Sequence, residues 1–271
     1  MQSQLIPTPR AFVQPTLWIA ILLVVIVLGA NFLPLPPLLS GTPSADAIGE
    51  GLAPTLIGLV VVCAAVTVLG WWRPVLTDRS RVHPSWGAVP AVFVVAWCGL
   101  IATGDYSADG TFLLAAIVST VIVVVNEELI MRGVLITGLR GVRVPEWGVW
   151  LLSSLVFALA HYALLIGPDP AGFEDATAFV RSAFFLGTLA YLTRRVTGSL
   201  AACVVLHSVN NIALYGIHED QWAREWFAGA GALCFYAALP VVIALLITEA
   251  ARDRRRRGDG HAVVGAEPAQ L

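Results

Sequence analysis

The stretch that decides the fold is Phe112-Leu-Leu-Ala-Ala-Ile-Val-Ser-Thr-Val-Ile-Val-Val-Val125, followed directly by Asn126-Glu-Glu-Leu-Ile-Met-Arg132. Its first part carries no charge and is rich in Val and Ile, so it predicts a helix that lies in a lipid bilayer. Three ionisable side chains end it, at Glu127, Glu128 and Arg132. A charge at bilayer depth costs roughly 2.5–3.5 kcal/mol on insertion scales, so ionisable groups at such a position indicate a functional site.

On a helix, the side chains of the two glutamates point in different directions. Glu128 and Arg132 are four residues apart, so on a helix they share one face and can form an ion pair. Glu127 lies about 100° further round the helix axis and points elsewhere. An alternative interpretation is a salt-bridged edge at which the helix simply leaves the lipid, and these residues alone do not decide between the two.

Composition indicates a polytopic membrane protein. Of the 271 residues, 58% are hydrophobic and 13% are charged, whereas an ordinary soluble domain is about 25% charged. All 16 basic residues are arginine, and with abundant Ala, Val and Gly this favours a GC-rich bacterial genome and a multi-pass protein of the bacterial cytoplasmic (inner) membrane. The four cysteines lie in apolar segments, at spacings that suggest neither a disulfide framework nor a zinc site.

Eight apolar runs divide the chain, each near the roughly 20 residues that a membrane-spanning helix needs. They fall at about residues 16–34, 52–72, 88–103, 111–131, 147–165, 176–193, 199–217 and 227–249. We therefore predict an all-α transmembrane bundle of about eight spans, forming a single domain over residues 1–251. The fourth helix is expected to continue past Arg132 to about Leu139.

The charges between these runs alternate along the chain. Nearly all arginines outside the runs fall in the N-terminal lead, in every second connection and in the tail, whereas the other connections are acidic and hold only Arg224. The positive-inside rule then puts both termini in the cytoplasm. The tail, residues 252–271, opens with five arginines in six residues. We expect it to be basic, disordered and attracted to anionic headgroups.

Two histidines fall inside the apolar runs. His161 closes Phe157-Ala-Leu-Ala-His161 in the fifth run, and His207 opens His207-Ser-Val-Asn-Asn211 in the seventh. A lone histidine in a membrane helix is most often a structural group bonded to a neighbouring helix. At a rise of ~1.5 Å per residue from the cytoplasmic ends, Glu127, His161 and Asn211 lie ~20–22 Å deep and His207 ~14 Å. The four side chains can therefore converge near mid-membrane.

Two kinds of chemistry suit this set of side chains. A carboxylate beside an imidazole can activate a water molecule, while an amide and a second imidazole donate hydrogen bonds to a developing oxyanion. Alternatively, Glu127, His161 and His207 make a plausible ligand set for a divalent metal such as Zn²⁺. The HExxH motif of common zinc proteases and the Gly-x-Ser-x-Gly motif are both absent. The cofactor question stays open at this point, between none and a divalent metal.

Taken together, the three motifs resemble those of the CAAX prenyl endopeptidase and bacteriocin-processing family of intramembrane proteases, also called the Abi family. The family pattern is EExxxR, FxxxH and HxxxN in successive helices. It is matched here by Glu127 to Arg132, Phe157 to His161 and His207 to Asn211, and the resemblance covers about residues 111–217. Each motif alone is weak, but the three together, on helices whose predicted topology agrees, are specific.

The resemblance implies hydrolysis of a peptide bond inside a membrane cavity. By resemblance, Glu127 and His161 would activate the water and His207 and Asn211 would stabilise the oxyanion. Glu128 and Arg132 would form a supporting pair. The family is described both as metalloproteases and as metal-free glutamate proteases, and the His/Asn spacing favours the metal-free mechanism.

The resemblance also implies the partners, which are a membrane protein or peptide as substrate and the lipid bilayer, without nucleic acid. Some family members trim prenylated CAAX proteins, and bacterial ones are linked to bacteriocin processing, immunity and signalling. Two other function classes stay open beside the protease. One is a non-catalytic immunity or scaffold protein that retains the polar cluster, and the other is a small transporter or proton relay. The absence of an inverted repeat in the sequence disfavours the transporter.

Overall fold

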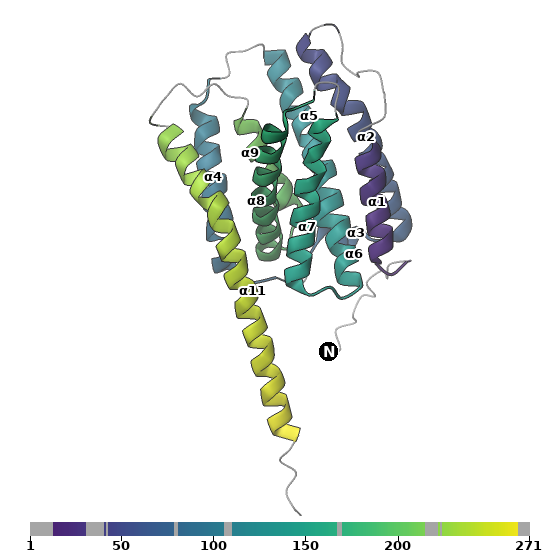
Figure 1. Ribbon diagram of the computed structural model, residues 1–271, viewed down its shortest axis with the longest axis vertical. Helices are drawn as coiled ribbons and strands as arrows, with labels where there is room; N and C mark the ends of the chain where they lie inside the picture. Colours follow the sequence, from purple (N-terminus) through teal and green to yellow (C-terminus); the bar gives the residue numbers. More distant parts are fainter. Residues whose placement is uncertain are drawn as a thin grey trace, which may run out of the picture.

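The structure is a computed structural model that describes residues 13–30, 41, 43–78, 81–105, 110–166, 170–214, 222 and 224–264. Helices joined by short connections make up this described part of the chain (Figure 1). The α-helices are α1 Leu17–Ala30, α2 Pro43–Leu69, α3 Trp72–Leu76, α4 Ala88–Thr103, α5 Gly110–Glu128, α6 Ile136–Gly141, α7 Glu146–Ala160, α8 Phe173–Thr197, α9 Leu200–Ala213 and α11 Gly229–Val264. Shorter 3₁₀ or π segments are η1 Pro84–Gly87, η2 Leu129–Leu135, η3 His161–Leu165 and η4 Arg224–Ala228.

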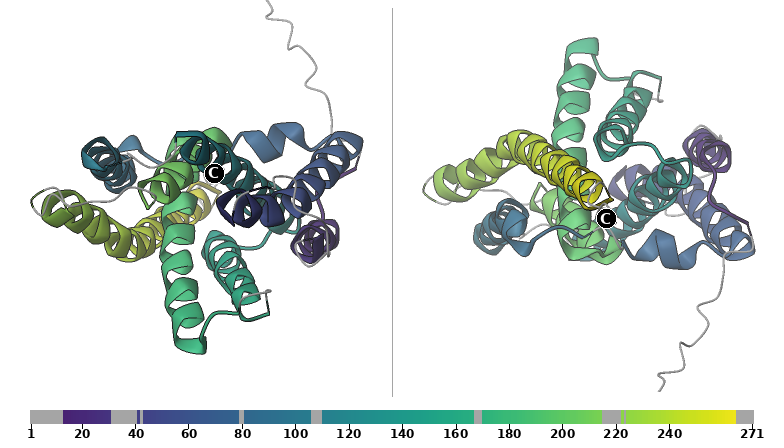
Figure 2. Two further views of the ribbon diagram at one scale, coloured as in Figure 1. Left: turned by 90° about the horizontal axis from the view of Figure 1, so that it is seen from above. Right: turned by 90° about the horizontal axis from the view of Figure 1, so that it is seen from below.

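The helices share one hydrophobic core, which takes buried side chains from every part of the bundle between α1 and α11. Helix α9 packs against α4, α5 and α8. In both end views of Figure 2, α7 and α8 form a pair that projects from the bundle, with α1 and α2 to one side and α4 and α11 to the other. The motif-bearing helices α5, α7 and α9 therefore meet between these groups.

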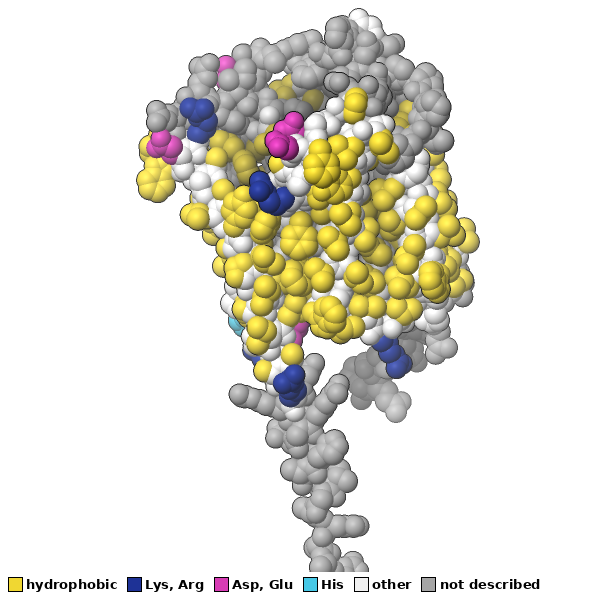
Figure 3. All heavy atoms as spheres, in the orientation of Figure 1, with side chains coloured by type: hydrophobic (Ala, Val, Ile, Leu, Met, Phe, Trp, Pro, Cys, Tyr) yellow, Lys and Arg dark blue, Asp and Glu magenta, His cyan; other side chains and the backbone are white. Residues whose placement is uncertain are grey.

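Apolar side chains cover the middle of the bundle on the face shown in Figure 3, and charged side chains gather towards its two ends. Among the described residues, six helical stretches are long and apolar enough to cross a membrane, and they occupy Leu52–Leu69, Pro84–Thr103, Leu113–Gly141, Glu146–Leu165, Phe173–Thr197 and Arg224–Arg252. The expected all-α multi-pass membrane protein is confirmed at this level. The count of eight spans stays a prediction.

The first and seventh predicted spans correspond to shorter apolar helices, α1 and α9, of 14 residues each. At ~1.5 Å per residue such a helix is about 21 Å long, less than the ~30 Å hydrocarbon core. The residue before helix α9, Ser199, forms a β-bridge with Thr77, so the start of α9 lies against another segment of the chain. The last residues of these two predicted spans, 31–34 and 215–217, lie outside the described residues.

The fourth span runs as predicted, with α5, η2 and α6 forming one continuous helical stretch from Gly110 to Gly141. The charged tail differs from expectation over its first part. Helix α11 continues to Val264, so residues 252–264 are helical, and Figure 1 shows this helix extending well beyond the bundle. The remainder, 265–271, lies outside the described residues.

Five chain segments meet at the end of the bundle from which α11 extends. The backbone at Val13 is bonded to Leu69 and to the indole of Trp71. A Cβ added at Gly141 would collide with the backbone of Pro15, and an ion pair joins helices α8 and α11 through Arg195 and Glu249. These contacts bring together the segments in which the sequence concentrates its arginines. The positive-inside rule predicts that this end faces the cytoplasm, and this orientation stays a prediction.

Candidate active site

The helix that carries the first motif changes its winding at the motif. Helix α5 ends at Glu128, and Leu129–Leu135 form a π-helical segment, η2, in which every residue is buried. Such π-turns inside α-helices occur frequently at functional sites, because they rotate the side chains on either side relative to a regular helix. The two glutamates therefore stand at the junction, and Arg132 lies within the widened turn.

Glu128 and Arg132 form the ion pair that their spacing predicts. Arg132 Nη1 lies 3.2 Å from Glu128 Oε1, and both side chains are fully buried, at 0% exposure. The Arg132 guanidinium also lies over the Phe157 ring, 4.2 Å from its centroid, in a cation–π contact with α7. A side chain at Gly187 would meet this packing, because a Cβ there would lie 3.2 Å from Arg132 Nη2.

His207 lies between the two carboxylates. Its Nδ1 is 2.9 Å from Glu128 Oε1, and its Nε2 is 3.7 Å from Glu127 Oε2. Because Glu128 is ion-paired as a carboxylate and can only accept, Nδ1 carries the proton and donates it. Glu127 is the more accessible carboxylate, at 30% exposure of its side chain against 0% for Glu128. The bond between Glu128 and His207 was not predicted from the sequence.

His161 stands where α7 gives way to the 3₁₀ segment η3. Its Nδ1 donates to the Phe157 carbonyl oxygen at 2.9 Å, which leaves Nε2 as the nitrogen that can serve chemistry. The buried Phe157 ring meets both imidazoles edge-on, with centroids 4.9 Å from His161 and 5.7 Å from His207. Phe157 thus holds both histidines in fixed orientations. Among the described residues Glu127 forms no hydrogen bond or ion pair with His161, and its partner is His207.

Asn211 lies one turn beyond His207 on α9, as predicted, and is half-buried. Its Oδ1 accepts a hydrogen bond of 2.9 Å from Nδ2 of the neighbouring Asn210. Sequence reasoning did not single out Asn210, although its place beside the motif asparagine was visible.

The proposed metal ligands do not assemble into a metal site. Within the part of the chain that the structure describes, no group of three or more His, Cys, Asp or Glu side chains is placed so that it could hold a metal ion. Glu127 Oε2 and His207 Nε2 approach each other at 3.7 Å without His161. The residues present therefore do not fit the triad of Glu127, His161 and His207.

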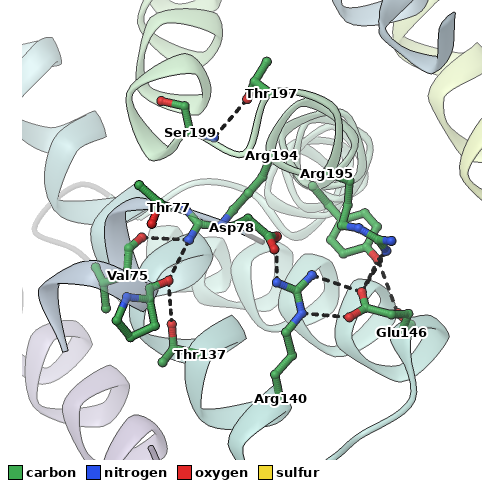
Figure 4. A network of polar contacts seen from close by, with 12 residues as sticks. Val75, Thr77, Asp78, Thr137, Arg140, Glu146, Arg194, Arg195, Thr197 and Ser199 are labelled. Carbon is green, nitrogen blue, oxygen red and sulfur yellow. Dashed lines mark hydrogen bonds and ion pairs between the residues drawn. The ribbon is translucent and has the colours of Figure 1, made fainter. Parts of the chain in front are cut away.

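A second polar cluster, which we call the end network, joins the helices at the end of the bundle from which α11 extends (Figure 4). It consists of Asp78, Arg140, Glu146, Tyr191, Arg195 and Glu249. Arg140 joins Asp78 at 2.6 Å to Glu146 at 2.7 Å, and Arg195 joins Glu146 at 2.9 Å to Glu249 at 2.7 Å. These ion pairs link α6, α7, α8 and α11 to one another.

The end network is connected to η2 through α3. Beside it, Arg194 donates to the carbonyl oxygens of Pro74 at 3.0 Å and Val75 at 2.7 Å, as Figure 4 shows for Val75. The Val75 side chain packs against Gly133 of η2, where an added Cβ would lie 2.8 Å from Val75 Cγ1. Arg194, which the sequence analysis used only to predict topology, therefore also fixes the α3 backbone that packs against η2.

Comparison with known proteins agrees with the motifs. Residues 109–213, which hold α5 to α9, match the family model described as "Rce1-like: Type II CAAX prenyl endopeptidase Rce1-like". Neither a curated protein nor a solved structure matches the chain. The match covers the three helices that carry the EExxxR, FxxxH and HxxxN motifs. This segment is similar to the type II CAAX prenyl endopeptidases, and the match supports the resemblance to the CAAX prenyl endopeptidase and bacteriocin-processing family of intramembrane proteases.

Proposed function

We propose that this protein is an intramembrane endopeptidase in which Glu127 activates a water molecule to cleave a peptide bond. Its substrate would be a membrane-associated protein or peptide, and its location the bacterial cytoplasmic membrane. The observation that carries the proposal is the array in which Arg132 pairs with Glu128, Glu128 holds His207, and His207 faces Glu127. An accessible carboxylate beside an imidazole oriented by a buried carboxylate is an arrangement suited to acid–base work.

Glu127 acts as the general base in this mechanism. Its carboxylate takes a proton from water while the water oxygen forms a bond to the scissile carbonyl carbon. As the tetrahedral intermediate collapses, the C–N bond breaks, Glu127 returns the proton to the leaving amine, and the carboxylate is regenerated. The free Nε2 of His161 holds the water or the leaving amine in line, because its Nδ1 is fixed on the Phe157 carbonyl.

His207 and Asn211 stabilise the oxyanion. His207 can donate from Nε2 only when it carries both protons, because its Nδ1–H is committed to Glu128. Asn211 contributes its amide N–H groups from the same side of α9. Such donors act strongly where water is excluded, and loss of one typically lowers turnover about 10²–10³-fold. Glu128 and Arg132 keep His207 in place rather than touching substrate.

A cleavage assay tests the proposal. The purified protein would be reconstituted in phosphatidylethanolamine/phosphatidylglycerol vesicles with a quenched-fluorescent library of single-span peptides, with a farnesylated C-a-a-X peptide as a separate probe. We expect cleavage by the wild type and essentially none by Glu127→Gln, which keeps the shape but removes the base. Glu174→Gln is the matched control, because Glu174 is exposed at the start of α8.

Two results would contradict the assignment. Equal cleavage by wild type and Glu127→Gln would remove Glu127 as the base. A folded wild type that cleaves neither the library nor the farnesylated peptide would favour the non-catalytic immunity or scaffold protein. Cleavage of only the farnesylated peptide would name a prenylated substrate class, whereas cleavage of only library members would exclude the requirement for a prenyl group.

A further inference from the structure

The carboxamide of Asn210 lies against that of Asn211, one turn of α9 beyond His207. Asn210 Nδ2 donates to Asn211 Oδ1 across 2.9 Å, and both side chains are half-buried, whereas His207 one turn earlier is buried. At about 100° per residue, positions 210 and 211 flank the direction in which residue 207 leaves the helix. The two amides therefore stand on either side of the catalytic imidazole.

The direction of this hydrogen bond decides what Asn211 can offer to a substrate. An asparagine side chain presents an acceptor oxygen on one side and an NH₂ donor on the other. Because Asn211 Oδ1 is occupied by Asn210, its NH₂ group is turned to the opposite side. If the Asn211 amide turned over while Asn210 kept its orientation, the two NH₂ groups would face each other and the hydrogen bond would be lost.

We propose that Asn210 is a positioning residue that fixes the Asn211 amide with its N–H donors directed at the oxyanion. Asn210 acts through Asn211 and does not itself contact the reacting atoms. This inference rests on the proposed function, because it assumes that Asn211 is an oxyanion donor. It adds a requirement that the motif alone does not contain, namely a hydrogen-bond donor at the position before the motif asparagine.

Asn210→Asp is the sharpest test, because a carboxylate can only accept. The variant obliges Asn211 to turn its NH₂ group towards residue 210, so turnover should fall towards that of Asn211→Ala, about 10²–10³-fold below wild type. Asn210→Ala removes the hydrogen bond to Asn211 Oδ1 but does not force the Asn211 amide to turn over. Since a single hydrogen bond contributes about 0.5–1.5 kcal/mol, its turnover should fall only about 2–10-fold. Both losses should appear in kcat, with KM little changed.

The assay uses the full-length protein in the vesicles described above, with the best-cleaved single-span peptide from the library as probe. A negative charge at residue 210 could disfavour the oxyanion without turning any amide, and a double-mutant cycle separates the two effects. In an Asn211→Ala background there is no amide to turn, so Asn210→Asp should then lower kcat by less than about tenfold.

Three outcomes would overturn the proposal. Wild-type turnover in Asn210→Asp, with Asn211→Ala impaired, would refute the positioning role and leave the donor role of Asn211 intact. A full additional loss in the Asn211→Ala background would assign the effect to charge. Wild-type turnover in Asn211→Ala would refute the donor role and the positioning role with it. Should Asn210→Asp fail to fold, Asn210→Ala and its cycle with Asn211→Ala carry the same test.

Discussion

Replacing Arg132 with alanine should destabilise the bundle and stop turnover, because it removes the ion pair with Glu128. Arg132 and Glu128 are both fully buried and 3.2 Å apart, so the variant leaves the Glu128 carboxylate without its counter-charge inside the membrane. It also removes the guanidinium that lies 4.2 Å from the centroid of the Phe157 ring. Since Glu128 holds His207 at 2.9 Å, an unpaired Glu128 would shift or become protonated and release the imidazole.

The magnitude follows from the burial of the pair. Removing one partner of a buried ion pair costs about 3–5 kcal/mol, because the other charge is left uncompensated. For a chain of this size that corresponds to a fall in Tm on the order of 10 °C. Arg132→Lys keeps the charge but replaces the planar fork with a compact ammonium, which packs less well over Phe157. It should recover only part of the stability and turnover.

Thermal unfolding in detergent, followed by tryptophan fluorescence, and peptide cleavage in vesicles would measure the two effects. Arg181→Ala is the matched control, because Arg181 is exposed on α8 and its loss should change stability by no more than about 0.5 kcal/mol. Full stability together with full turnover in Arg132→Ala would refute the reasoning.

Two further predictions concern packing and topology. Gly187→Ala would place a Cβ 3.2 Å from Arg132 Nη2, and such overpacking should cost about 1–3 kcal/mol and lower turnover. Gly229→Ala, where nothing lies within 4 Å of the added Cβ, should do neither, and identical melting curves and rates for the two variants would contradict the account. A reporter fused after Arg257 should lie in the cytoplasm and one inserted at Asp169 should lie outside, by the positive-inside rule. The reverse pair of signals would overturn the assigned orientation.

Much of the fold follows from hydropathy, because an apolar run in lipid must satisfy its backbone internally and therefore forms a helix. Each predicted run contains a helix in the structure. Hydropathy does not distinguish lipid from protein as the apolar surroundings of a helix. It therefore does not settle whether α9, whose start at Leu200 lies beside the Thr77–Ser199 bridge, spans the membrane. The same pattern analysis assigned disorder to the arginine-rich tail, although arginine is a good helix former and α11 continues through it to Val264.

The residues of the candidate site could be predicted from the sequence, whereas the contacts between them could be predicted only in part. The ion pair of Glu128 and Arg132 follows from four-residue spacing, which a local rule can capture. The bond from His207 to Glu128 does not, because it depends on how α5 is rotated against α9 and on the π-turn that begins at Leu129. A prediction that assumes a constant helical period cannot locate the π-turn at Leu129–Leu135.

The end network was hidden for a different reason. Arginines at the cytoplasmic ends of helices satisfy the positive-inside rule wherever they point, so that rule explained Arg140 and Arg195 without partners. Their carboxylate partners come from distant segments, with Asp78 before α4 and Glu249 on α11. Such pairs depend on the packing of whole helices and have no local signature.

In the proposed mechanism the Glu127 carboxylate itself activates water, rather than serving as a metal ligand with His161 and His207. Metal content and turnover measured on the same chelator-treated preparation test it most directly, with Glu127→Gln and His207→Ala analysed alongside the wild type. We expect undiminished wild-type turnover at far less than one bound metal ion per chain. One zinc ion per active chain, lost together with activity in both variants, would contradict it.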